Sequence, residues 1–405
     1  MTDRTKRVFV IGGGITGLTA AYTLLSTSDR KNLEVTILER EPRLGGKIKS
    51  TKVNGNIVER GPESFLADRA AILRLCDKLG LSERIVGMGP EANQTYLAQD
   101  NHLFPLPPGT LMGIPFLEQT LISAPLPEAK EAAKSFFALP KSTFLTFRQG
   151  LQTLIDALAL AIGEEHIRLG VRVVRINKNA ENPSVDSNSS AYTIHLTNGT
   201  TLEADGVILT VPPFVAAQLL PDEEVKHALN CILYSSVATV TLLFLPDQVD
   251  TTNLKGAGFI VPKTEPHAIT ACTFQSSKWP HSTKDGAIAL RCFLGGVGQE
   301  EMALCSDFEM THRVREDLRT LMQINATPGR VLIKRWPNAI PQYTADHHER
   351  VVAIRQLLTE RFPGILLAGA GYEGIEIPEC IVQGEAVAQQ LIDFIQQTTL
   401  VNHAS

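Results

Sequence analysis

The chain has no apolar segment long enough to cross a bilayer. Its longest apolar run, Val237 to Leu245, is far shorter than the roughly 20 residues of a transmembrane helix. The stretch from Met1 to Lys6 is polar and leads straight into an apolar segment, so it does not have the pattern of a signal peptide. These absences predict a cytoplasmic protein and leave open a peripheral contact at the inner face of the cell membrane.

The sequence lacks the cysteine patterns that are typical of metal sites and the basic runs that are typical of nucleic-acid binding. The six cysteines are scattered, without a CxxC pair or a histidine at zinc spacing, which indicates reduced thiols and no metal site. The formal net charge is −5 at pH 7, and there is no run of lysine or arginine. We therefore expect no nucleic-acid partner, and an anionic substrate would need a local cationic pocket.

The length and the glycine pattern are the informative features. With 405 residues the chain can form two domains. Near its start, Gly12, Gly14 and Gly17 form a GxGxxG motif after an apolar strand and before a helix. These glycines allow a tight turn, a close approach of backbone to pyrophosphate, and close packing of helix on strand. Glu39 ends the next strand, where a carboxylate can accept both ribose hydroxyl groups.

A second glycine-rich turn stands near the other end of the chain. Residues 365–388 read ILLAGAGYEGIEIPECIVQGEAVA, which is again a strand, a glycine turn and a helix. A chain that opens and closes in this way is expected to wrap one dinucleotide from both sides. This predicts FAD rather than NAD, and therefore redox chemistry.

Hydrophobic periodicity places further elements along the chain. Strands are expected at residues 7–11, 33–38, 54–60, 167–176, 192–196, 201–204, 207–211, 237–244, 258–261, 269–273, 287–293 and 331–336, and at the start of residues 365–388. Helices are expected at residues 15–25, 68–79, 128–138 and 308–322, and from residue 150 onward. Asn198-Gly199 predicts a hairpin turn, and residues 177–190 have the composition of a surface loop. The cofactor half is therefore discontinuous, with a β-rich half inserted into it.

Two more turns follow the first glycine motif. One is RLGGK, from Arg43 to Lys47, and the other is GPES, from Gly61 to Ser64. Each alone is typical of an ordinary turn. Their order after GxGxxG and the acidic strand end makes them specific.

Together these motifs resemble the FAD-dependent porphyrinogen oxidases, within the wider amine-oxidase and phytoene-desaturase superfamily. The similarity is greatest to the Gram-positive bacterial type that oxidises coproporphyrinogen III. The segments GAGFIVPK, ITACTFQSSKWPH, KRWPNAIPQY and AGAGYEGIEIPECI carry this resemblance, which covers both ends and most of the second half of the chain.

The resemblance implies an α/β fold. It consists of a discontinuous Rossmann-like FAD-binding domain at residues 1–80, 145–230 and 350–400, and an inserted β-rich substrate domain at residues 85–110 and 231–345. Residues 111–144 would be the shortened remnant of a longer helical segment that walls the substrate cavity and contacts membranes in the family. Either this lineage has a reduced segment, or the segment has been removed.

The resemblance also implies which residues bind FAD. The pyrophosphate and ribose would be held at the N-terminal motif, the flavin by RLGGK, GPES and the C-terminal turn, and the adenine by one backbone segment. The implied residues are Gly12, Gly13, Gly14, Ile15, Thr16, Gly17, Glu39, Arg40, Gly46, Lys47, Gly61, Pro62, Glu63, Ser64, Val173, Trp336, Ala370, Ile375, Glu376 and Ile377. The helix near Pro378 would aim its positive end at the flavin.

The implied reaction is oxidation of a porphyrinogen, either coproporphyrinogen III or protoporphyrinogen IX, in haem biosynthesis. FAD accepts hydride in successive two-electron rounds and returns the electrons to O2 as H2O2, so no protein residue is expected to be catalytic. His347 and His348 are expected to be surface residues of a loop. Arg69 and Trp279 are the candidates for substrate binding, and ferrochelatase is the candidate for a transient partner.

Two other functions remain open from the sequence. A flavin amine oxidase would need an aromatic cage, for which Tyr372 is one candidate wall. A non-catalytic FAD- and porphyrin-binding protein would hold the cofactor without turnover.

Overall fold

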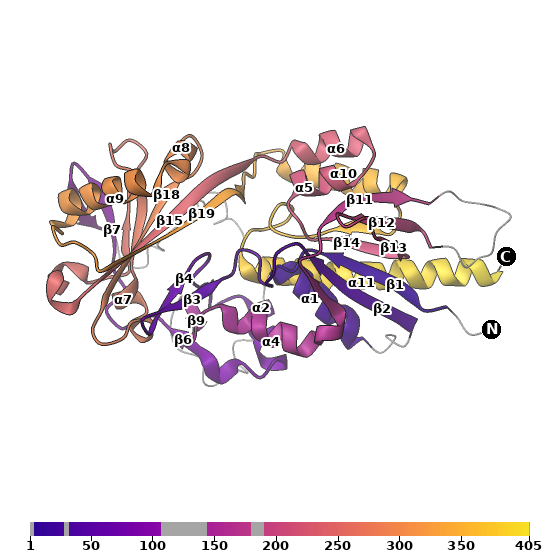
Figure 1. Ribbon diagram of the computed structural model, residues 1–405, viewed down its shortest axis with the longest axis horizontal. Coiled ribbons are helices and arrows are strands. Elements are labelled where there is room, and N and C mark those ends of the chain that lie inside the picture. Colours follow the sequence, from indigo (N-terminus) through magenta and orange to yellow (C-terminus); the bar gives the residue numbers. More distant parts are fainter. Residues whose placement is uncertain (1–3, 28–31, 107–143, 180–189, 405) are drawn as a thin grey trace.

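The protein has two halves joined by two long strands. The computed structural model describes residues 4–27, 32–106, 144–179 and 190–404. In Figure 1 the strands β15 (Tyr234–Phe244) and β19 (Arg330–Pro341) run from one half toward the other. Within the described ranges, no helix combines the length and apolarity that crossing a membrane requires.

The first half is built on a five-stranded parallel sheet in the order β10-β2-β1-β14-β20. Its strands are β1 (Lys6–Ile11), β2 (Leu33–Glu39), β10 (Ile167–Leu169), β14 (Gly206–Leu209) and β20 (Ile365–Leu367). The first and last strands of the chain, β1 and β20, both pair with β14. Because all five strands are parallel, their carboxyl ends lie at one edge of the sheet. This edge is where such sheets bind ligands.

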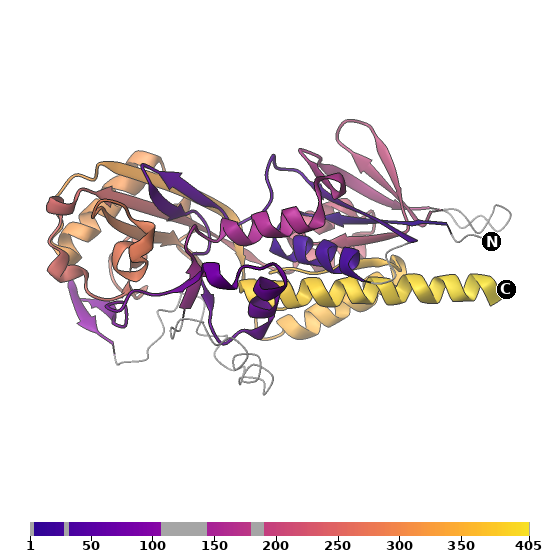
Figure 2. The same ribbon diagram turned by 90° about the horizontal axis from the view of Figure 1, so that it is seen from below.

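Both faces of this sheet are buried, which follows from the continuous apolar sequence of β1. Val8 and Val10 pack on one face with helices α1, α2, α4 and α11, whereas Phe9 and Ile11 pack on the other. Figure 1 shows one layer of helices above the sheet and the other below it, and Figure 2 views the molecule from the side of the first layer. The first layer comprises α1 (Ile15–Ser26), α2 (Ala70–Lys78), α4 (Gln152–Ile162) and α11 (Ile377–Ala404). The second comprises α5 (Pro213–Leu219), α6 (Glu223–Asn230) and α10 (His347–Arg361), with a small sheet of β11 (Val173–Lys178), β12 (Tyr192–Leu196) and β13 (Thr201–Ala204).

The second half is a seven-stranded sheet in the order β19-β15-β18-β17-β16-β7-β8. The further strands are β7 (Thr95–Gln99), β8 (His102–Pro105), β16 (Gly258–Ile260), β17 (Ile269–Phe274) and β18 (Ile288–Gly295). Helices α7 (Gln275–Lys278), α8 (Glu300–Leu304) and α9 (Asp307–Met322) accompany it. Apolar residues of α9, including Met310 and Val314, form its core with alternate residues of β15 and β18.

Two small sheets lie between the halves. One is the hairpin of β3 (Ser50–Val53) and β4 (Asn56–Glu59); the other consists of β5 (Phe65–Leu66), β9 (Phe144–Phe147) and β6 (Ile85–Gly87). Five short 3-10 turns complete the described structure: η2 (Ser82–Arg84), η3 (Glu164–His166), η4 (Pro246–Gln248), η5 (Thr251–Leu254) and η6 (Pro280–Ser282).

Most of the predicted elements that fall on described residues are confirmed, and the clearest exception is the strand expected at residues 167–176. The single strand expected at residues 167–176 is two strands, β10 and β11, that belong to different sheets. Gly170 separates them with a left-handed φ of 70°, a conformation in which glycine is favoured. The hairpin at Asn198-Gly199 is confirmed, with β12 paired to β13. The expected helix at residues 128–138, the segment 111–143 and most of the loop at 177–190 lie outside the described residues.

Candidate functional site

The turn between β1 and α1 has the geometry of a phosphate-binding turn. Gly12 has a φ of 113°, and a Cβ atom on Gly17 would lie 2.0 Å from the carbonyl oxygen of Gly12. Gly14 precedes the helix as its N-cap and, as a glycine, has no side chain with which to cap it. A Cβ atom on Gly14 would meet no protein atom within 4 Å. The uncapped N–H groups and the open space in front of them suit an anion.

Glu39 lies beside this turn at the carboxyl end of β2. Its Oε2 accepts the Gly13 N–H at 2.6 Å, and its Oε1 accepts the Glu41 N–H at 2.8 Å. The carboxylate is thereby fixed next to the glycine turn. Val171 donates its N–H to the Glu39 carbonyl at 2.9 Å, and this brings the start of β11, with Val173, to the same edge. The neighbouring Arg40 is exposed and forms a surface pair with Glu41 at 3.4 Å.

The RLGGK segment is joined directly to the first glycine turn. Gly45 donates its N–H to the Gly13 carbonyl at 2.8 Å, and Gly14 and Gly45 form a parallel bridge. Gly46 is exposed above Gly14. Lys47 extends toward the second half, where its Nζ donates to the carbonyl of Ala339. Burial lowers the pKa of Lys47 to about 8.

The C-terminal turn lies on the same edge. It follows β20 and leads into α11, whose Gly384 packs on α1 so closely that a Cβ atom would lie 2.6 Å from the Thr16 carbonyl oxygen. Gly369 donates its N–H to Oε1 of Gln383 at 3.0 Å. The prediction that both ends of the chain meet is confirmed in this geometry.

The last predicted segments of the site surround α11 at its start. Ala370, Ile375 and Glu376 are half-buried, and Ile377 begins the helix. The Glu376 N–H is accepted by Oε2 of Glu379 at 3.0 Å, so an acidic side chain occupies part of this helix end. From the second half, Trp336 reaches across and donates its Nε1–H to the Arg60 carbonyl at 2.7 Å.

The GPES turn is packed tightly against RLGGK. A Cβ atom on Gly61 would lie 1.8 Å from the Lys47 carbonyl oxygen, so only glycine fits there. Pro62 and Ser64 are half-buried. Both carboxylate oxygens of Glu63 are engaged by cations, Lys278 at 2.7 Å and Arg291 at 3.2 Å. This leaves the backbone of the turn, rather than the Glu63 carboxylate, to face a cofactor.

The two candidates for substrate binding differ in their surroundings. Arg69 precedes α2 and pairs with Glu376 at 3.3 Å, beside the start of α11. Its side chain is 27% exposed, so it can still meet a ligand. Trp279 is only 1% exposed and packs edge-on against His281. Its placement is that of a core residue.

His347 and His348 both begin α10, so the expectation that they lie on a loop is wrong, whereas His348 is exposed as predicted. His347, by contrast, is buried, with an exposure of 7%. Its ring stacks on Tyr343 with centroids 4.0 Å apart, and its Nε2 lies 2.8 Å from the Tyr372 carbonyl oxygen. Burial lowers the pKa of His347, and the neutral Nε2–H donates to this carbonyl.

Tyr343 is a residue of the site that the sequence analysis missed. Its hydroxyl donates to the Ala370 carbonyl at 2.7 Å and accepts the Gly374 N–H at 2.8 Å, so it spans the C-terminal glycine turn. Its place at the end of the KRWPNAIPQY segment was the available signal. Tyr372, the candidate cage wall, is 1% exposed, and its hydroxyl has no partner among the described residues.

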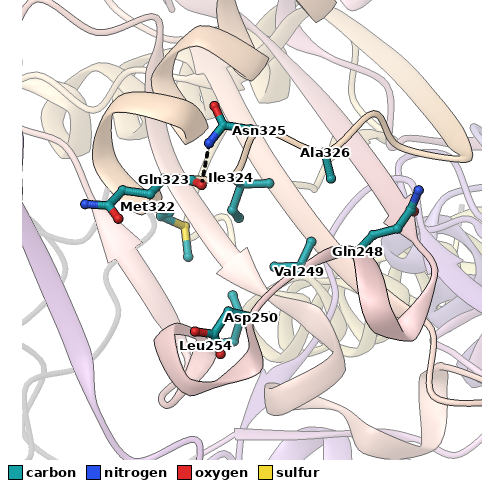
Figure 3. A pocket seen from close by; sticks show the side chains of 9 residues that line it. All are labelled: Gln248, Val249, Asp250, Leu254, Met322, Gln323, Ile324, Asn325 and Ala326. Atoms are coloured by element: carbon teal, nitrogen blue, oxygen red, sulfur yellow. Dashed lines mark hydrogen bonds between the residues drawn. The ribbon is translucent and has the colours of Figure 1, made fainter.

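The structure also contains a cavity of about 280 Å³ in the second half, away from the glycine turns (Figure 3). It lies between the turns that follow β15 and the end of α9. Its lining residues are Gln248, Val249, Asp250, Leu254, Met322, Gln323, Ile324, Asn325 and Ala326. In the described part of the chain, no group of three or more side chains is placed to hold a metal ion.

The arrangement of the glycine turns therefore suits a long dinucleotide. An uncapped helix end, a fixed carboxylate and two further glycine turns lie along one edge of the parallel sheet, and the seven-stranded sheet reaches the far end through Trp336 and Ala339. An arrangement of this kind fits FAD.

Comparison with known proteins agrees with this geometry. The family described as flavin containing amine oxidoreductase matches residues 15–144 and 128–392. Coproporphyrinogen III oxidase of Bacillus subtilis (strain 168) is 31% identical over 471 residues, covering 98% of this chain and 100% of the relative. Coproporphyrinogen III oxidase of Staphylococcus aureus is 27% identical, covering 96% and 99%. Because the first alignment is longer than the 405-residue chain, the Bacillus relative contains residues that this chain lacks.

Solved structures show the same fold. A protein from Exiguobacterium sp. 255-15, provisionally named protoporphyrinogen oxidase, has a TM-score of 0.80 at 27% identity, covering 96% of this chain and 98% of that one. A putrescine oxidase bound to putrescine has a TM-score of 0.68 at 15% identity, covering 96% and 99%. At that identity the putrescine oxidase indicates the fold alone.

Proposed function

The chain belongs to the flavin containing amine oxidoreductase family, and on that premise we propose that it oxidises coproporphyrinogen III to coproporphyrin III in haem biosynthesis. Electrons pass to O2, and each two-electron round releases one H2O2. Protoporphyrinogen IX is the alternative porphyrinogen. The full-length similarity to the Bacillus enzyme supports coproporphyrinogen III as the preferred substrate.

The observation that carries the proposal is the meeting of both ends of the chain at one edge of the parallel sheet. Gly45 bonds to Gly13, and Gly384 packs on Thr16, so three glycine-rich segments surround one space. The cofactor is FAD. The uncapped turn at Gly14 would hold its pyrophosphate, and Glu39 its adenosine ribose. FAD, when bound, accepts the hydride from the substrate and returns the electrons to O2.

The remaining residues of the site are proposed to shape the flavin end. Trp336, the backbone of Gly61–Ser64 and the segment 370–377 would border the ring, and Val173 would contact the adenine through its backbone. We assign no general base, since the flavin accepts the hydride and no residue of the protein is assigned as the acceptor of the substrate's proton. Arg69 would bind a propionate group in competition with Glu376.

The proposed domains keep the division inferred from the sequence. Residues 1–80, 145–230 and 350–400 would bind FAD, and residues 85–110 and 231–345 would carry the substrate. Residues 111–144 would be the shortened segment; the Bacillus relative is longer than this chain, and the family matches in two stretches, residues 15–144 and 128–392, that overlap within this segment.

The decisive test is porphyrin fluorescence after coproporphyrinogen III, and separately protoporphyrinogen IX, is added under air to the yellow purified protein. Fast appearance of fluorescence above autoxidation on the first substrate is the expected result. If the FAD-loaded protein leaves both porphyrinogens unoxidised, the proposal fails and the non-catalytic binding protein becomes the better account. The amine-oxidase alternative gains no support, because the candidate cage wall Tyr372 is buried.

We also propose the setting in which the enzyme works. It acts in the cytoplasm, contacts the inner face of the cell membrane peripherally, and transfers product during a transient contact with ferrochelatase. These proposals derive from the family resemblance. Co-sedimentation with anionic lipid vesicles, and with ferrochelatase, tests the two contacts separately.

A further inference from the structure

Arg60 and Gly61, in the turn that follows β4, are both hydrogen-bonded to the seven-stranded sheet. The Arg60 guanidinium donates to the Ile333 carbonyl at 2.6 Å, and Trp336 donates to the Arg60 carbonyl at 2.7 Å. The next carbonyl, that of Gly61, accepts from Nη2 of Arg291. The turn therefore belongs to the cofactor half by its packing on Lys47 and is held by the substrate half through these bonds.

Glu63 is the centre of the attachment. Its carboxylate binds Nζ of Lys278 on α7 at 2.7 Å and Nη1 of Arg291 on β18 at 3.2 Å. The three side chains are buried, with exposures of 10% for Glu63, 5% for Lys278 and 1% for Arg291. Lys278 also lies 4.8 Å above the Phe144 ring, and Arg291 lies 4.8 Å above the Phe293 ring. These aromatic faces hold the cations in place.

A buried group of this kind is not explained by stability alone. Removing charged groups from water is costly, and apolar residues of similar volume often give equal or greater stability. The charged groups instead fix the positions of their partners, since one arginine can bind two acceptors at once in a defined geometry. Here the two acceptors are the Glu63 carboxylate and the Gly61 carbonyl, which bracket the turn expected at the flavin. Burial raises the pKa of Glu63, but the neighbouring Lys278 and Arg291 outweigh it and hold that pKa below its usual range, so the Glu63 carboxylate is charged at neutral pH.

We infer that the Lys278–Glu63–Arg291 network positions the Gly61–Ser64 turn against the seven-stranded sheet and thereby sets the spacing between FAD and the substrate-bearing sheet. Glu63 is a positioning residue that acts through its turn, because both of its oxygens are occupied. The inference rests on the proposed function in placing FAD at this turn.

The principal variant is Arg291→Lys. A lysine keeps the positive charge and can bind Glu63, but it cannot also reach the Gly61 carbonyl in the planar geometry of arginine. We expect the Kd for FAD, measured by fluorescence titration of apoprotein, to rise about tenfold. In FAD-saturated protein under anaerobic conditions, we expect flavin reduction by coproporphyrinogen III to slow about tenfold while the substrate concentration for half-maximal rate changes little. Glu63→Gln removes the central charge and should have larger effects of the same kind.

The control is a second buried, hydrogen-bonded carboxyl group in the same half. Asp317 binds Nδ1 of His267 at 2.9 Å and accepts the N–H groups of Ala268 and Ile269 at 2.8 and 2.9 Å, with no bond to the turn. Asp317→Asn should lower the Tm without changing the Kd for FAD or the reduction rate. Lys278→Met removes the ion pair with Glu63 and should raise the Kd for FAD and slow flavin reduction. Lys278→Arg preserves the charge and an ion pair, so its Kd and reduction rate should be close to those of the wild type.

The results of these experiments distinguish the positioning role of the network from the proposed oxidase function. If Arg291→Lys lowers the Tm as Asp317→Asn does but keeps the wild-type Kd for FAD and reduction rate, the network is merely structural and the inference is overturned. If Glu63→Gln does not fold, Arg291→Lys decides. If the wild-type protein binds FAD but oxidises neither porphyrinogen, the proposed function fails, while a raised Kd for FAD in Arg291→Lys still supports the positioning role.

Discussion

Two glycines of one motif have different roles at the scale of the residue. Gly17 is required by the fold, because a Cβ atom there would lie 2.0 Å from the Gly12 carbonyl oxygen. Gly14 has an extended backbone, with φ of −76° and ψ of 177°, and its Cβ position is open. A side chain at Gly14 would therefore disturb a ligand and not the protein.

We accordingly expect Gly14→Val to fold normally and to lose FAD. The branched side chain would occupy the space in which backbone meets pyrophosphate. Absorbance at flavin wavelengths and the Tm of the apoprotein measure the two effects, with Gly17→Ala as the matched variant that should lose stability as well. Full FAD occupancy in Gly14→Val would show that the pyrophosphate binds elsewhere.

Glu59 should make the stability depend on pH. It is 4% exposed, and burial raises its pKa to about 7 although its Oε1 accepts the Leu151 N–H at 2.7 Å. An acid whose pKa is raised on folding stabilises the protein below its unfolded pKa of about 4.5, and this contribution is lost as the pH rises through 7. The loss amounts to about 3 kcal/mol at most.

Glu59→Gln can still accept the Leu151 N–H and does not ionise. We expect its Tm to exceed that of the wild type by a margin that grows from pH 5 to pH 8. Thermal unfolding at four pH values measures this margin. A difference that is constant over that range would mean that Glu59 does not titrate there.

The limits of sequence reasoning are also clear at this scale. The glycine motifs were readable because their backbone requirements are local. The partners of Glu63 are 215 and 228 residues away in the sequence, so no local pattern could reveal them. His347 was misassigned for a similar reason, since only the packing of α10 on the C-terminal turn buries it.

At the scale of the element, the contact between α1 and α11 determines the shape of the site. Glycine inside a helix normally weakens it by about 1 kcal/mol relative to alanine. At Gly384 the comparison should reverse, because a Cβ atom would lie 2.6 Å from the Thr16 carbonyl oxygen and 2.9 Å from Cβ of Thr19.

Gly384→Ala should therefore destabilise the protein by about 1–3 kcal/mol through overpacking, and it should weaken FAD binding because Thr16 follows the phosphate turn. Denaturant unfolding and FAD titration measure these effects. Gln390→Ala, at an exposed position of the same helix, is the control and should change neither by much. Equal stability of the two variants would contradict the tight contact.

Elements were predicted well where periodicity was uniform and poorly where a single residue redirected the chain. The strand expected at residues 167–176 is continuous in apolar pattern, yet the left-handed Gly170 separates β10 from β11. The pairing partners show that these are two strands, because β10 joins the parallel sheet beside β2 whereas β11 pairs with β12.

At the scale of the whole molecule, FAD should protect both halves. The hydrogen bonds from Trp336 and Arg291 connect the cofactor turn to β19 and β18. A ligand present at 100 times its Kd stabilises the native state by about 2.7 kcal/mol. We expect added FAD to slow hydrogen–deuterium exchange at residues 12–17 and 369–377, and also along β18 and β19, while the distant hairpin β7–β8 is unchanged. Protection confined to the first half would show that the two halves respond separately.

The position of β20 also has a consequence for the order of events during synthesis. The sheet strand β14 has β1 on one side from the moment it emerges from the ribosome, but its other edge stays unpaired until β20 has been translated, more than 150 residues later. The strands from β15 to β19 are complete before that time and can pair with one another on the nascent chain. A site that includes the C-terminal glycine turn is therefore complete only after β20 and the start of α11 have been translated, later than every strand from β15 to β19.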